Sequence, residues 1–414
     1  MKNIRQSNIS IHRDSWVEIN LENLAYNIKE IRKSVPEGKK LLAVVKADAY
    51  GHGAVMLAPT ILASGCDMLG VASIDEGIDL RNAKIGCEIL VLGAVPVWAV
   101  ESAVNAGISI AIFSKEHLAA CKQAYERTGV KPKVHVKIDT GMNRIGVQPA
   151  DAVDFIREVQ AADYLQIQGI FTHLYEAESV EETVKQVNIW NSIISQIDTT
   201  GLLLHIQNTA GTLCYDVPTS NMLRIGIGLY GLAPDYPTRE SLATFQLSET
   251  LEWRGRQRSH GLANHVCQAG GGELLFTDKD FKKPELKPLM SLKGRIVHIH
   301  ETGAPAGVSY CHTFKTDVPV KVATIPVGYA DGVSRLLSNR ITAELNGKKI
   351  RQIGNITMDQ MMFDITGVDA SVGDVVTLIG DGAMTIDEWA KILGTINYEL
   401  TCRLKVRLPR VYTR

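Results

Sequence analysis

The chain has 414 residues, of which 45% are hydrophobic and 21% charged, and its formal net charge is −1. Single hydrophobic cores stop growing at around 250–300 residues, so this length predicts one large domain and a smaller one. The composition is that of an ordinary soluble globular protein, and the near-neutral charge gives no reason to expect nucleic acid or an anionic membrane as a partner.

The seven cysteines form no C-x-x-C pair, which favours reduced thiols in a cytosol over disulfides or a zinc cage. The start of the chain, MKNIRQSNISIHRDSW, lacks the apolar core and cleavage site of a secretory signal, so a cytoplasmic location is expected. The longest apolar stretch, 89–104, is interrupted by Gly93, Pro96 and Glu101. This stretch is therefore interpreted as a buried strand followed by a helix, and no membrane association is expected.

Short β-branched runs alternate with longer amphipathic segments from residue 41 onward, which is typical of parallel βα units. A series of eight such runs favours a (β/α)8 TIM barrel over an open doubly wound sheet. They are LLAVVKADAY from Leu41, DMLGVAS from Asp67, EILVLGA from Glu88, ISIAIFS from Ile108, KVHVKIDT from Lys133, LQIQGIFTH from Leu165, LLLHIQNT from Leu202 and MLRIGIGLYG from Met222. Between two of them, Ser114 and Gly129 are the expected N-cap and C-terminal stop of a helix.

After Pro234 the pattern changes. Turn signals such as Asn346-Gly347 separate short strands (PVKVATIPV, DVVTLIG), which predicts a second, mainly β domain. The segment between the two parts has charge clusters, a glycine run and little periodicity, so it is interpreted as a surface excursion or partly ordered insert. The expected boundaries are 15–235 for the barrel, 236–287 for the insert, and 288–414 together with 1–14 for the β-rich domain.

Lys46 lies late in the otherwise apolar first run, where a charged ammonium is costly unless it is paired or reacts. A lysine in such a setting can form a Schiff base with a carbonyl cofactor. The alternative is a lysine that extends to the barrel rim, and the run alone favours that alternative.

The glycine-rich segment GIGLYG, residues 226–231, formally matches the dinucleotide fingerprint G-x-G-x-x-G. The sequence that follows, LAPDYP, cannot open the helix that the fingerprint requires, and the run before it is the eighth rather than the first. A glycine-rich turn after the last strands of a barrel is where such folds hold phosphate. The expected phosphate ligands are the amides of Gly226 and Ile227, the hydroxyl of Thr209 and the phenols of Tyr50 and Tyr398.

A series of motifs, in order along most of the chain, resembles the alanine racemase family. The series comprises VKADAYGHG from Val45, KIDTGMNRIGV from Lys137, FTHLYEAE around His173, NTAGT from Asn208, MLRIGIGLYGLAP from Met222, AGVSYCHTF around Tyr310, PVGYADG around Tyr329, MDQ from Met358 and INYE from Ile396. One such motif would be weak, whereas nine in order are very specific. The resemblance implies a pyridoxal-phosphate enzyme in which Lys46 carries the cofactor as a Schiff base.

The resemblance further implies a two-base racemisation, in which Lys46 and Tyr310 serve opposite enantiomers. Arg224 would meet the pyridine nitrogen and keep it unprotonated, and His173 would bridge Arg224 and Tyr310. As a lone strand-end histidine, His173 would otherwise be read as a satisfied core residue.

The remaining implied roles concern the substrate and the cofactor's oxygens. Arg144 would contact the phenolic oxygen of the cofactor and the substrate carboxylate, and Lys137, often carbamylated in this family, would hold Arg144 in place. The other implied contacts are Asn208 to the cofactor, and Met358, Asp359 and Tyr329 to the substrate. The family's enzymes are homodimers in which each site borrows Tyr310, Met358 and Asp359 from the partner.

Two positions depart from the family pattern. Thr209 stands where serine is commoner, and both residues offer a hydroxyl. Cys311 stands where glycine usually follows the tyrosine, so the backbone there is expected to be less free.

The expected activity is interconversion of L- and D-alanine for peptidoglycan synthesis, with Tyr398 favouring alanine over serine by limiting side-chain room. A serine or broad-specificity racemase is the main alternative. The Arg224 environment argues against a decarboxylase, the second domain argues against a non-enzymatic cofactor carrier, and a chain inactivated by its insert stays open.

No metal is expected. Two histidine–cysteine groups, His298 with His300, Cys311 and His312, and His260 with His265 and Cys267, lack established zinc spacing. Surface or strand-face histidines account for both better.

Overall fold

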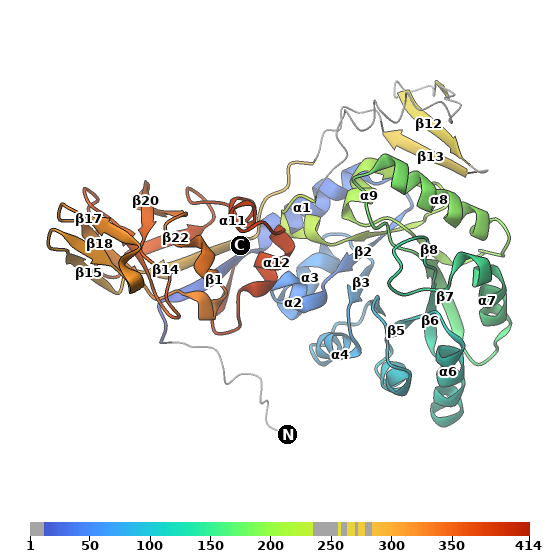
Figure 1. Ribbon diagram of the computed structural model, residues 1–414. Helices are drawn as coiled ribbons and strands as arrows, with labels where there is room; N and C mark the ends of the chain where they lie inside the picture. Colours follow the sequence, from blue (N-terminus) through green and yellow to red (C-terminus); the bar gives the residue numbers. More distant parts are fainter. Residues whose placement is uncertain (1–11, 235–255, 258–262, 270–271, 278–283) are drawn as a thin grey trace. The chain divides into compact units, whose positions relative to one another are not determined.

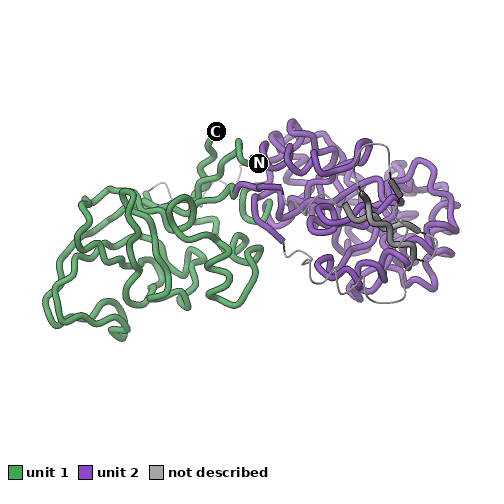
Figure 2. The backbone as a smooth tube through the Cα atoms, turned by 90° about the horizontal axis from the view of Figure 1, so that it is seen from above, with its two compact units in different colours: residues 1–24, 49–53, 288–414 green, residues 25–48, 54–287 purple. Residues whose placement is uncertain are grey.

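A computed structural model describes residues 12–234, 256–257, 263–269, 272–277 and 284–414 (Figure 1). The chain forms two compact units (Figure 2): unit 1 comprises residues 1–24, 49–53 and 288–414, and unit 2 comprises residues 25–48 and 54–287. Each unit is described by itself. No helix in the described ranges is both long and apolar enough to cross a membrane.

Unit 2 is built on an eight-stranded parallel sheet in the order β10-β2-β3-β4-β5-β6-β7-β8. The strands are β2 (Lys40–Val44), β3 (Met68–Val71), β4 (Glu88–Val91), β5 (Ser109–Ile112), β6 (Lys133–Lys137), β7 (Gln166–Phe171), β8 (Leu203–His205) and β10 (Met222–Ile225). The first and last strands of this order also meet, because the Asn221 N–H donates to Leu204 O (2.9 Å) and the Arg224 N–H to Gln207 O (3.2 Å). The sheet is therefore a barrel, and its eight strands are those expected from the sequence.

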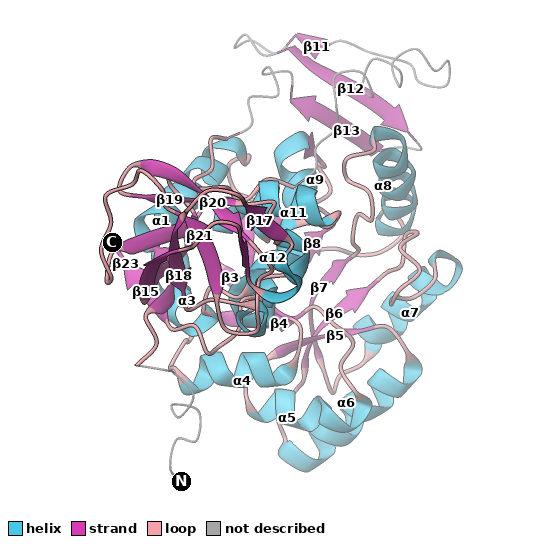
Figure 3. Ribbon diagram, turned by 60° about the vertical axis from the view of Figure 1, so that its left-hand side comes forward, coloured by secondary structure: helices cyan, strands magenta, loops and turns pink. Residues whose placement is uncertain are grey.

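Helices lie outside these strands (Figures 1 and 3), so the outer face of the barrel is covered and its strands are almost wholly buried. The helices of the barrel region are α1 (Leu21–Ser34), α2 (Lys46–Tyr50), α3 (Ala54–Ala63), α4 (Ile74–Asn82), α5 (Val100–Asn105), α6 (Lys115–Thr128), α7 (Pro149–Ala161), α8 (Val180–Ile194) and α9 (Thr209–Cys214), with 3-10 turns η2 (Val97–Ala99) and η3 (Ile227–Tyr230). The expected caps of α6 are confirmed: Ser114 accepts the His117 N–H, and Gly129 has φ +69°.

The segment expected to be an insert carries three strands whose backbone is described: β11 (Arg256–Gln257), β12 (Ala263–Ala269) and β13 (Gly272–Thr277). They form a small sheet in the order β11-β12-β13-β9, in which the last strand is β9 (Tyr215–Asp216) of the barrel region. This segment therefore adds strands beside β9, the short strand that follows α9. Residues 235–255, 258–262, 270–271 and 278–283 lie outside the described residues.

Unit 1 is mainly β, as expected, and its nine-stranded sheet has the order β15-β18-β21-β20-β19-β22-β14-β1-β23. The strands are β1 (Ser15–Asn20), β14 (Met290–Arg295), β15 (His298–Glu301), β18 (Lys321–Ile325), β19 (Thr342–Leu345), β20 (Lys348–Ile353), β21 (Met361–Asp364), β22 (Val375–Ile379) and β23 (Arg410–Thr413). The strand near the chain start that joins this sheet is Ser15–Asn20, although residue 15 was the expected start of the barrel. It pairs with β14 and β23. Its alternate residues are buried, which is typical of a strand in a sheet with one covered face.

Local turn chemistry fits the rest of unit 1. Asn346 and Gly347, with φ of +50° and +78°, join β19 to β20 in the tight hairpin expected from the sequence. A capping box between Thr385 and Glu388 begins α11 (Ile386–Leu393), and Gly394 ends it. The remaining elements are α12 (Asn397–Arg403), the pair β16 (Ala306–Val308) and β17 (Phe314–Thr316), and 3-10 turns η4 (Tyr310–His312), η5 (Tyr329–Asp331) and η6 (Arg335–Leu337).

Candidate active site

The residues singled out in the sequence are divided between the two units. Unit 2 holds Lys46, Lys137, Arg144, His173, Asn208, Thr209, Arg224, Gly226 and Ile227, and unit 1 holds Tyr50, Tyr310, Tyr329, Met358, Asp359 and Tyr398.

Lys46 does not lie in the first barrel strand, as the sequence suggested, but just beyond it. Strand β2 ends at Val44, and Lys46 begins α2, in which residues 47–50 all have φ between +52° and +54°. These are left-handed backbone conformations, which cost a non-glycine residue roughly 1–2 kcal/mol each. Tertiary contacts must therefore hold the turn that follows Lys46.

Two carboxylates hold the first part of this turn. Glu76 accepts the Ala47 N–H at Oε1 (2.8 Å) and the Ala72 N–H at Oε2 (2.7 Å), and Asp48 accepts the Ala54 N–H (2.8 Å). Glu76 thus ties the backbone next to Lys46 to the segment that follows the second barrel strand. Glu76 could not be identified from the sequence, because nothing there indicates which amides a glutamate at a helix start will bind.

Arg224, on the last barrel strand, is 3% exposed and is surrounded by acceptors. Its Nη1 donates to the carbonyl of His205 (2.8 Å) and to His205 Nδ1 (3.0 Å). Its Nη2 donates to the carbonyls of Thr172 (2.7 Å) and Ile206 (3.0 Å) and to His173 Nδ1 (3.1 Å). Within the described ranges, Nε–H is the one guanidinium nitrogen without an acceptor. Burial lowers the pKa of Arg224 to about 9, which leaves it protonated at neutral pH.

The contact with Arg224 also determines the state of His173. A guanidinium has only donors, so His173 Nδ1 must be an acceptor and the ring proton of the neutral imidazole must lie on Nε2. Burial, followed by the positive charges of Arg224 and Lys137, holds the pKa of His173 well below its usual value. His173 is therefore a neutral imidazole that offers an Nε2–H donor.

Lys137, the last residue of β6, is 4% exposed, and its Nζ lies 5.0 Å from the centre of the Phe171 ring. Burial, followed by the charges of Arg224 and Arg144, lowers the pKa of Lys137 to about 7. Lys46 acts on Lys137 in the same direction. A large share of Lys137 is therefore the uncharged amine at neutral pH.

Arg144 lies on a loop whose shape depends on Asp139. The two oxygens of this buried carboxylate accept backbone N–H groups from Gly141 (3.0 Å), Asn143 (3.0 Å) and Arg144 (3.1 Å). The loop returns to the barrel where the Val147 N–H donates to Lys137 O (2.9 Å). Asp139 is thus occupied with amides, although it partly offsets the positive potential at Lys137.

The segments after the last two barrel strands meet at Thr209. Its hydroxyl oxygen accepts the Gly226 N–H (2.9 Å), so the hydroxyl hydrogen stays available for another acceptor. The amide of Gly226, expected to contact phosphate directly, is engaged in holding Thr209. Asn208 is the N-cap of α9 and accepts the Gly211 N–H (2.9 Å), and Ile227 begins η3.

In unit 1, Tyr50 and Tyr398 lie together, with their ring centres 6.1 Å apart. Burial and the neighbouring Tyr398 raise the pKa of Tyr50. The backbone of Gly51, the residue after Tyr50, lies close to α12, because a Cβ at Gly51 would lie 2.4 Å from Thr401 O. The structure therefore brings together two of the five expected phosphate ligands in unit 1, and three in unit 2.

Tyr310 begins η4, and its side chain is 71% exposed. Its carbonyl accepts the Asn355 Nδ2 donor (2.7 Å), while Ser309 Oγ donates to Asn355 O (2.6 Å). Cys311 has φ +61°, a left-handed conformation that explains why glycine suits this position. The turn is thus fixed through its backbone, and the phenol stays exposed.

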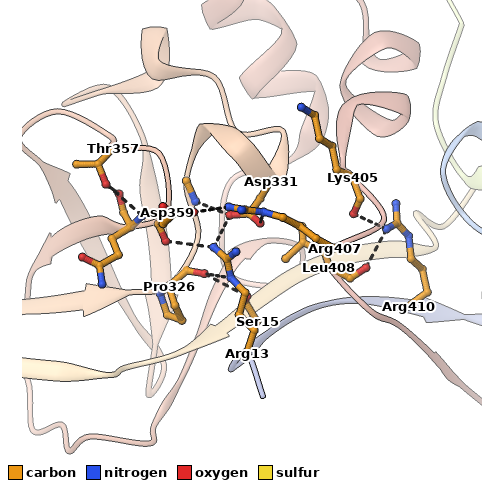
Figure 4. A network of polar contacts seen from close by, with 12 residues as sticks. Arg13, Ser15, Pro326, Asp331, Thr357, Asp359, Lys405, Arg407, Leu408 and Arg410 are labelled. Atoms are coloured by element: carbon orange, nitrogen blue, oxygen red, sulfur yellow. Dashed lines mark hydrogen bonds and ion pairs between the residues drawn. The ribbon is translucent and has the colours of Figure 1, made fainter. Parts of the chain in front are cut away.

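Tyr329, Met358 and Asp359 also lie together, because the Tyr329 N–H donates to Thr357 O (3.0 Å) and the Ala330 N–H to Met358 O (3.0 Å). Beneath them is a network around the fully buried Asp331, shown in Figure 4.

Asp331 binds Arg13 (2.7 Å) and Arg407 (2.6 Å) and accepts the Gly328 N–H (2.8 Å). Arg407 also pairs with Asp359 (2.7 Å). This network was not predicted from the sequence, although Asp331 lies within the PVGYADG motif.

Among the described residues, no group of three or more His, Cys, Asp or Glu could hold a metal ion. The rings of His298 and His300 stack with centres 5.1 Å apart. His260 and the side chains of His265 and Cys267 lie outside the described residues.

Comparisons with known proteins agree along the whole chain. Residues 19–234 match the family model described as alanine racemase, N-terminal domain, and residues 289–412 match alanine racemase, C-terminal domain. The chain is 34% identical to alanine racemase 1 of Oceanobacillus iheyensis, with 98% of this chain and 99% of that protein aligned.

Solved structures are similar as well. An alanine racemase of Clostridium difficile 630 has a TM-score of 0.82 at 35% identity, covering 98% of this chain and 97% of that one. The alanine racemase of Bartonella henselae with covalently bound pyridoxal phosphate has a TM-score of 0.76 at 25% identity, covering 97% and 99%.

Proposed function

The chain belongs to the alanine racemase family, and from that premise we propose that it interconverts L-alanine and D-alanine with pyridoxal phosphate as cofactor. The observation that carries the proposal is the excess of positive charge at the mouth of the barrel. Lys46, Arg144 and Arg224 all act on Lys137, and the nearby carboxylate of Asp139 is engaged by three backbone amides. An anion bound beside these groups would offset their mutual repulsion.

Pyridoxal phosphate has the groups that this cluster lacks. Its phosphate would accept the hydroxyl hydrogen of Thr209, and its pyridine nitrogen would accept the Nε–H of Arg224, which has no acceptor within the described residues. Lys46 has the amine for covalent attachment. The residues present therefore fit this cofactor, which the Bartonella henselae relative holds covalently.

When bound, pyridoxal phosphate supplies a ring that withdraws electrons from the substrate α-carbon and so acidifies its hydrogen. Arg224 would donate a hydrogen bond to the ring nitrogen without transferring its proton, because its pKa of about 9 keeps the guanidinium charged at neutral pH. This contact would leave the nitrogen unprotonated and moderate the electron withdrawal. Moderate withdrawal disfavours side reactions such as transamination.

Racemisation needs one proton carrier on each face of the α-carbon. The amine of Lys46 would serve one face and the phenol of Tyr310 the other. Arg144 would bind the substrate carboxylate. His173, a neutral imidazole anchored on Arg224, would donate its Nε2–H to the oxygen of Tyr310 and so stabilise the deprotonated form of the phenol.

Lys137 is suited to carbamylation. Its uncharged amine can add CO₂, which forms an N–C bond and releases one proton, so that a carbamate anion replaces the amine beside Arg144. Carbon-13 bicarbonate should give a carbamate NMR signal that Lys137→Met lacks. If activity is unchanged both when bicarbonate is removed and in Lys137→Met, carbamylation of Lys137 has no role in the reaction.

The exposed residues of unit 1 support a site completed by a second copy of the chain. Tyr310 and Met358 are 71% and 53% exposed, unusual for groups that contact a substrate, and Asp359 is exposed beside them. We place these residues in the active site of the partner, in a cytoplasmic homodimer that supplies D-alanine for peptidoglycan.

Mixing two inactive variants tests the shared site. In a hybrid of Lys46→Ala and Tyr310→Phe chains, one site receives both changes and the other receives neither. Subunit exchange should restore roughly a quarter of wild-type activity, since half of the dimers are hybrids with one intact site. No restoration, with hybrids present by mass, would place both residues in one chain's site.

Substrate choice is assigned to Tyr398, whose ring lies beside that of Tyr50. Tyr398→Asn makes room and should raise serine turnover relative to alanine. Unchanged serine turnover would place the selectivity elsewhere.

The activity itself is tested by chiral analysis of L-alanine incubated with the protein and pyridoxal phosphate, beside a Lys46→Ala variant. D-alanine should form with the wild-type protein alone. Failure of the wild-type protein with bound cofactor would redirect the search to other amino acids, with serine first.

A further inference from the structure

Two histidines in the barrel core lie behind Arg224 and have no part in the proposed chemistry. His135 in β6 and His205 at the end of β8 are both 0% exposed. His135 Nδ1 and His205 Nε2 are 3.0 Å apart, and the ring planes are nearly perpendicular. The ring of Phe171 stacks on His205, with an interplanar angle of 2°.

The strand between them allows this contact. β7 pairs with both β6 and β8, and Gly169 on β7 lies opposite His135. A Cβ at Gly169 would lie 2.6 Å from His135 Nδ1, so any other residue would displace the ring. The two imidazoles thus meet across an intervening strand because that strand has no side chain at this point.

The contacts determine which atom donates at each hydrogen bond in the series Arg224–His205–His135. Arg224 Nη1 can only donate, so His205 Nδ1 accepts and His205 carries its proton on Nε2. That Nε2–H donates to His135 Nδ1, which places the proton of His135 on its own Nε2. His135 Nε2 is buried and has no partner within the described residues, so the chain of donors ends there.

Both imidazoles are neutral in this arrangement. Burial, followed by the charge of Arg224, lowers the pKa of His135 to about 3, and the same two causes hold the pKa of His205 well below its usual value. A proton added to either ring would set one N–H against another. His135 is therefore an acceptor, and within the described residues its Nδ1 is the only ring atom that makes a hydrogen bond.

We propose that His135 is a positioning residue for Arg224. By accepting from His205, His135 holds His205 as the Nε2–H tautomer, and His205 in turn holds the Nη1 edge of the guanidinium. With both Nη groups fixed by the protein, the Nε–H would be held ready for the ring nitrogen of the cofactor. Only this last step rests on the proposed function.

Three variants separate positioning from bulk packing. His135→Leu keeps the volume but removes the acceptor, and His135→Asn retains an acceptor close to the place of Nδ1. His117→Leu is the matched control, because His117 is also buried and makes hydrogen bonds through both ring nitrogens, to Ser114 Oγ (2.9 Å) and Val95 O (3.0 Å). Neither of these bonds leads to Arg224.

The first measurement is the tautomer of each histidine, by nitrogen-15 NMR of the full-length wild-type chain without cofactor. His205 and His135 should both be neutral with the proton on Nε2. In His135→Leu, the Nε2–H of His205 should exchange with solvent faster, by about tenfold or more. A proton on Nδ1 of His205, or a charged ring, would overturn the proposal whether or not the chain binds pyridoxal phosphate.

The second measurement uses the holoenzyme with nitrogen-15 in the pyridine ring. In His135→Leu, the ring-nitrogen signal should shift and kcat should fall about tenfold, with KM within about threefold. His135→Asn should stay near wild type, and His117→Leu should lower the melting temperature alone.

An unchanged ring-nitrogen signal in His135→Leu would overturn the proposal, as would an equal shift in His117→Leu. A wild-type chain that binds no pyridoxal phosphate would instead reject the proposed function. The tautomer measurement would still show whether His135 accepts a hydrogen bond from His205.

Discussion

Units 2 and 1 hold their candidate site residues in opposite ways. Arg224 in unit 2 is 3% exposed, and its own side chain makes five hydrogen bonds, whereas Tyr310 in unit 1 is 71% exposed and is held through its backbone carbonyl. A group fixed by its side chain contributes to stability as well as chemistry. A residue held only through its backbone leaves its side chain available to contact a molecule outside the unit. Changes in the two units should therefore affect stability and activity differently.

The sharpest test of this difference is Tyr310→Phe. The substitution removes only an exposed hydroxyl, so we expect kcat to fall about 10³-fold through loss of one proton carrier. The melting temperature should stay within experimental error. Tyr125→Phe, a hydroxyl deletion on α6, is the control and should leave both quantities unchanged. A clear loss of stability in Tyr310→Phe would show that this phenol is packed and would break the contrast.

Asp331→Ala is expected to have the next largest effect, on stability. It removes the buried carboxylate that lies next to the exposed residues Met358 and Asp359. Removal of the carboxylate leaves Arg13 and Arg407 without their buried partner, so the free energy of unfolding should fall by about 3 kcal/mol. Denaturant unfolding measures this change. Asp359→Asn alters an exposed partner of the same Arg407 and should cost under about 1 kcal/mol. Equal costs would mean that burial is not what makes Asp331 important.

Lys137→Met tests the charge cluster of unit 2 through pH. The pKa of Lys137 is about 7 in the folded chain, against 10.5 for an ordinary lysine, so between these values the unfolded chain binds more protons. Wild-type stability should therefore rise with pH across this window, by about 2 kcal/mol between pH 7 and 9, relative to the variant. Urea midpoints in CO₂-free buffer at both pH values measure the difference. Parallel pH curves would show that Lys137 stays charged.

Cys311→Gly should give the smallest effect. Its φ of +61° costs a cysteine more than a glycine, so the substitution should stabilise unit 1 by about 1 kcal/mol or less. Thermal unfolding in reducing buffer is the measurement, with Cys402→Gly as a control in which glycine replaces a residue within α12 and destabilises. A destabilised Cys311→Gly chain would mean that the thiol makes contacts worth more than the strain.

The barrel strands and the β-rich second unit could be predicted because their patterns are local. Buried parallel strands appear as apolar runs, and Ser114 and Gly129 bound α6 through their own side-chain and backbone preferences. That the start of the chain joins the β-rich unit was expected, but the extent of this contribution, Ser15–Asn20 rather than residues 1–14, could not be predicted, because it depends on pairing with strands 270 or more residues away.

The candidate site shows the same limit. Motifs identified the residues proposed to contact cofactor and substrate, but not the residues that hold those side chains in place. Glu76, Asp139 and His135 act through backbone amides or through another ring, and such contacts depend on distances that no spacing in the sequence encodes. The strand assigned to Lys46 was too long for a related reason. An apolar run predicts burial, but it does not predict that the backbone turns left-handed at Ala47.

That left-handed turn inverts the usual scale of substitution effects. In an ordinary helix, alanine is more stabilising than glycine. Residues 47–50 have φ near +53°, which glycine adopts more easily than alanine, so here glycine should be the more stabilising residue. A chain made by chemical ligation with D-alanine at positions 47 and 49 should therefore be more stable than the natural one. An enzyme proposed to make D-alanine would contain, next to its key lysine, a backbone shape that D-alanine itself prefers.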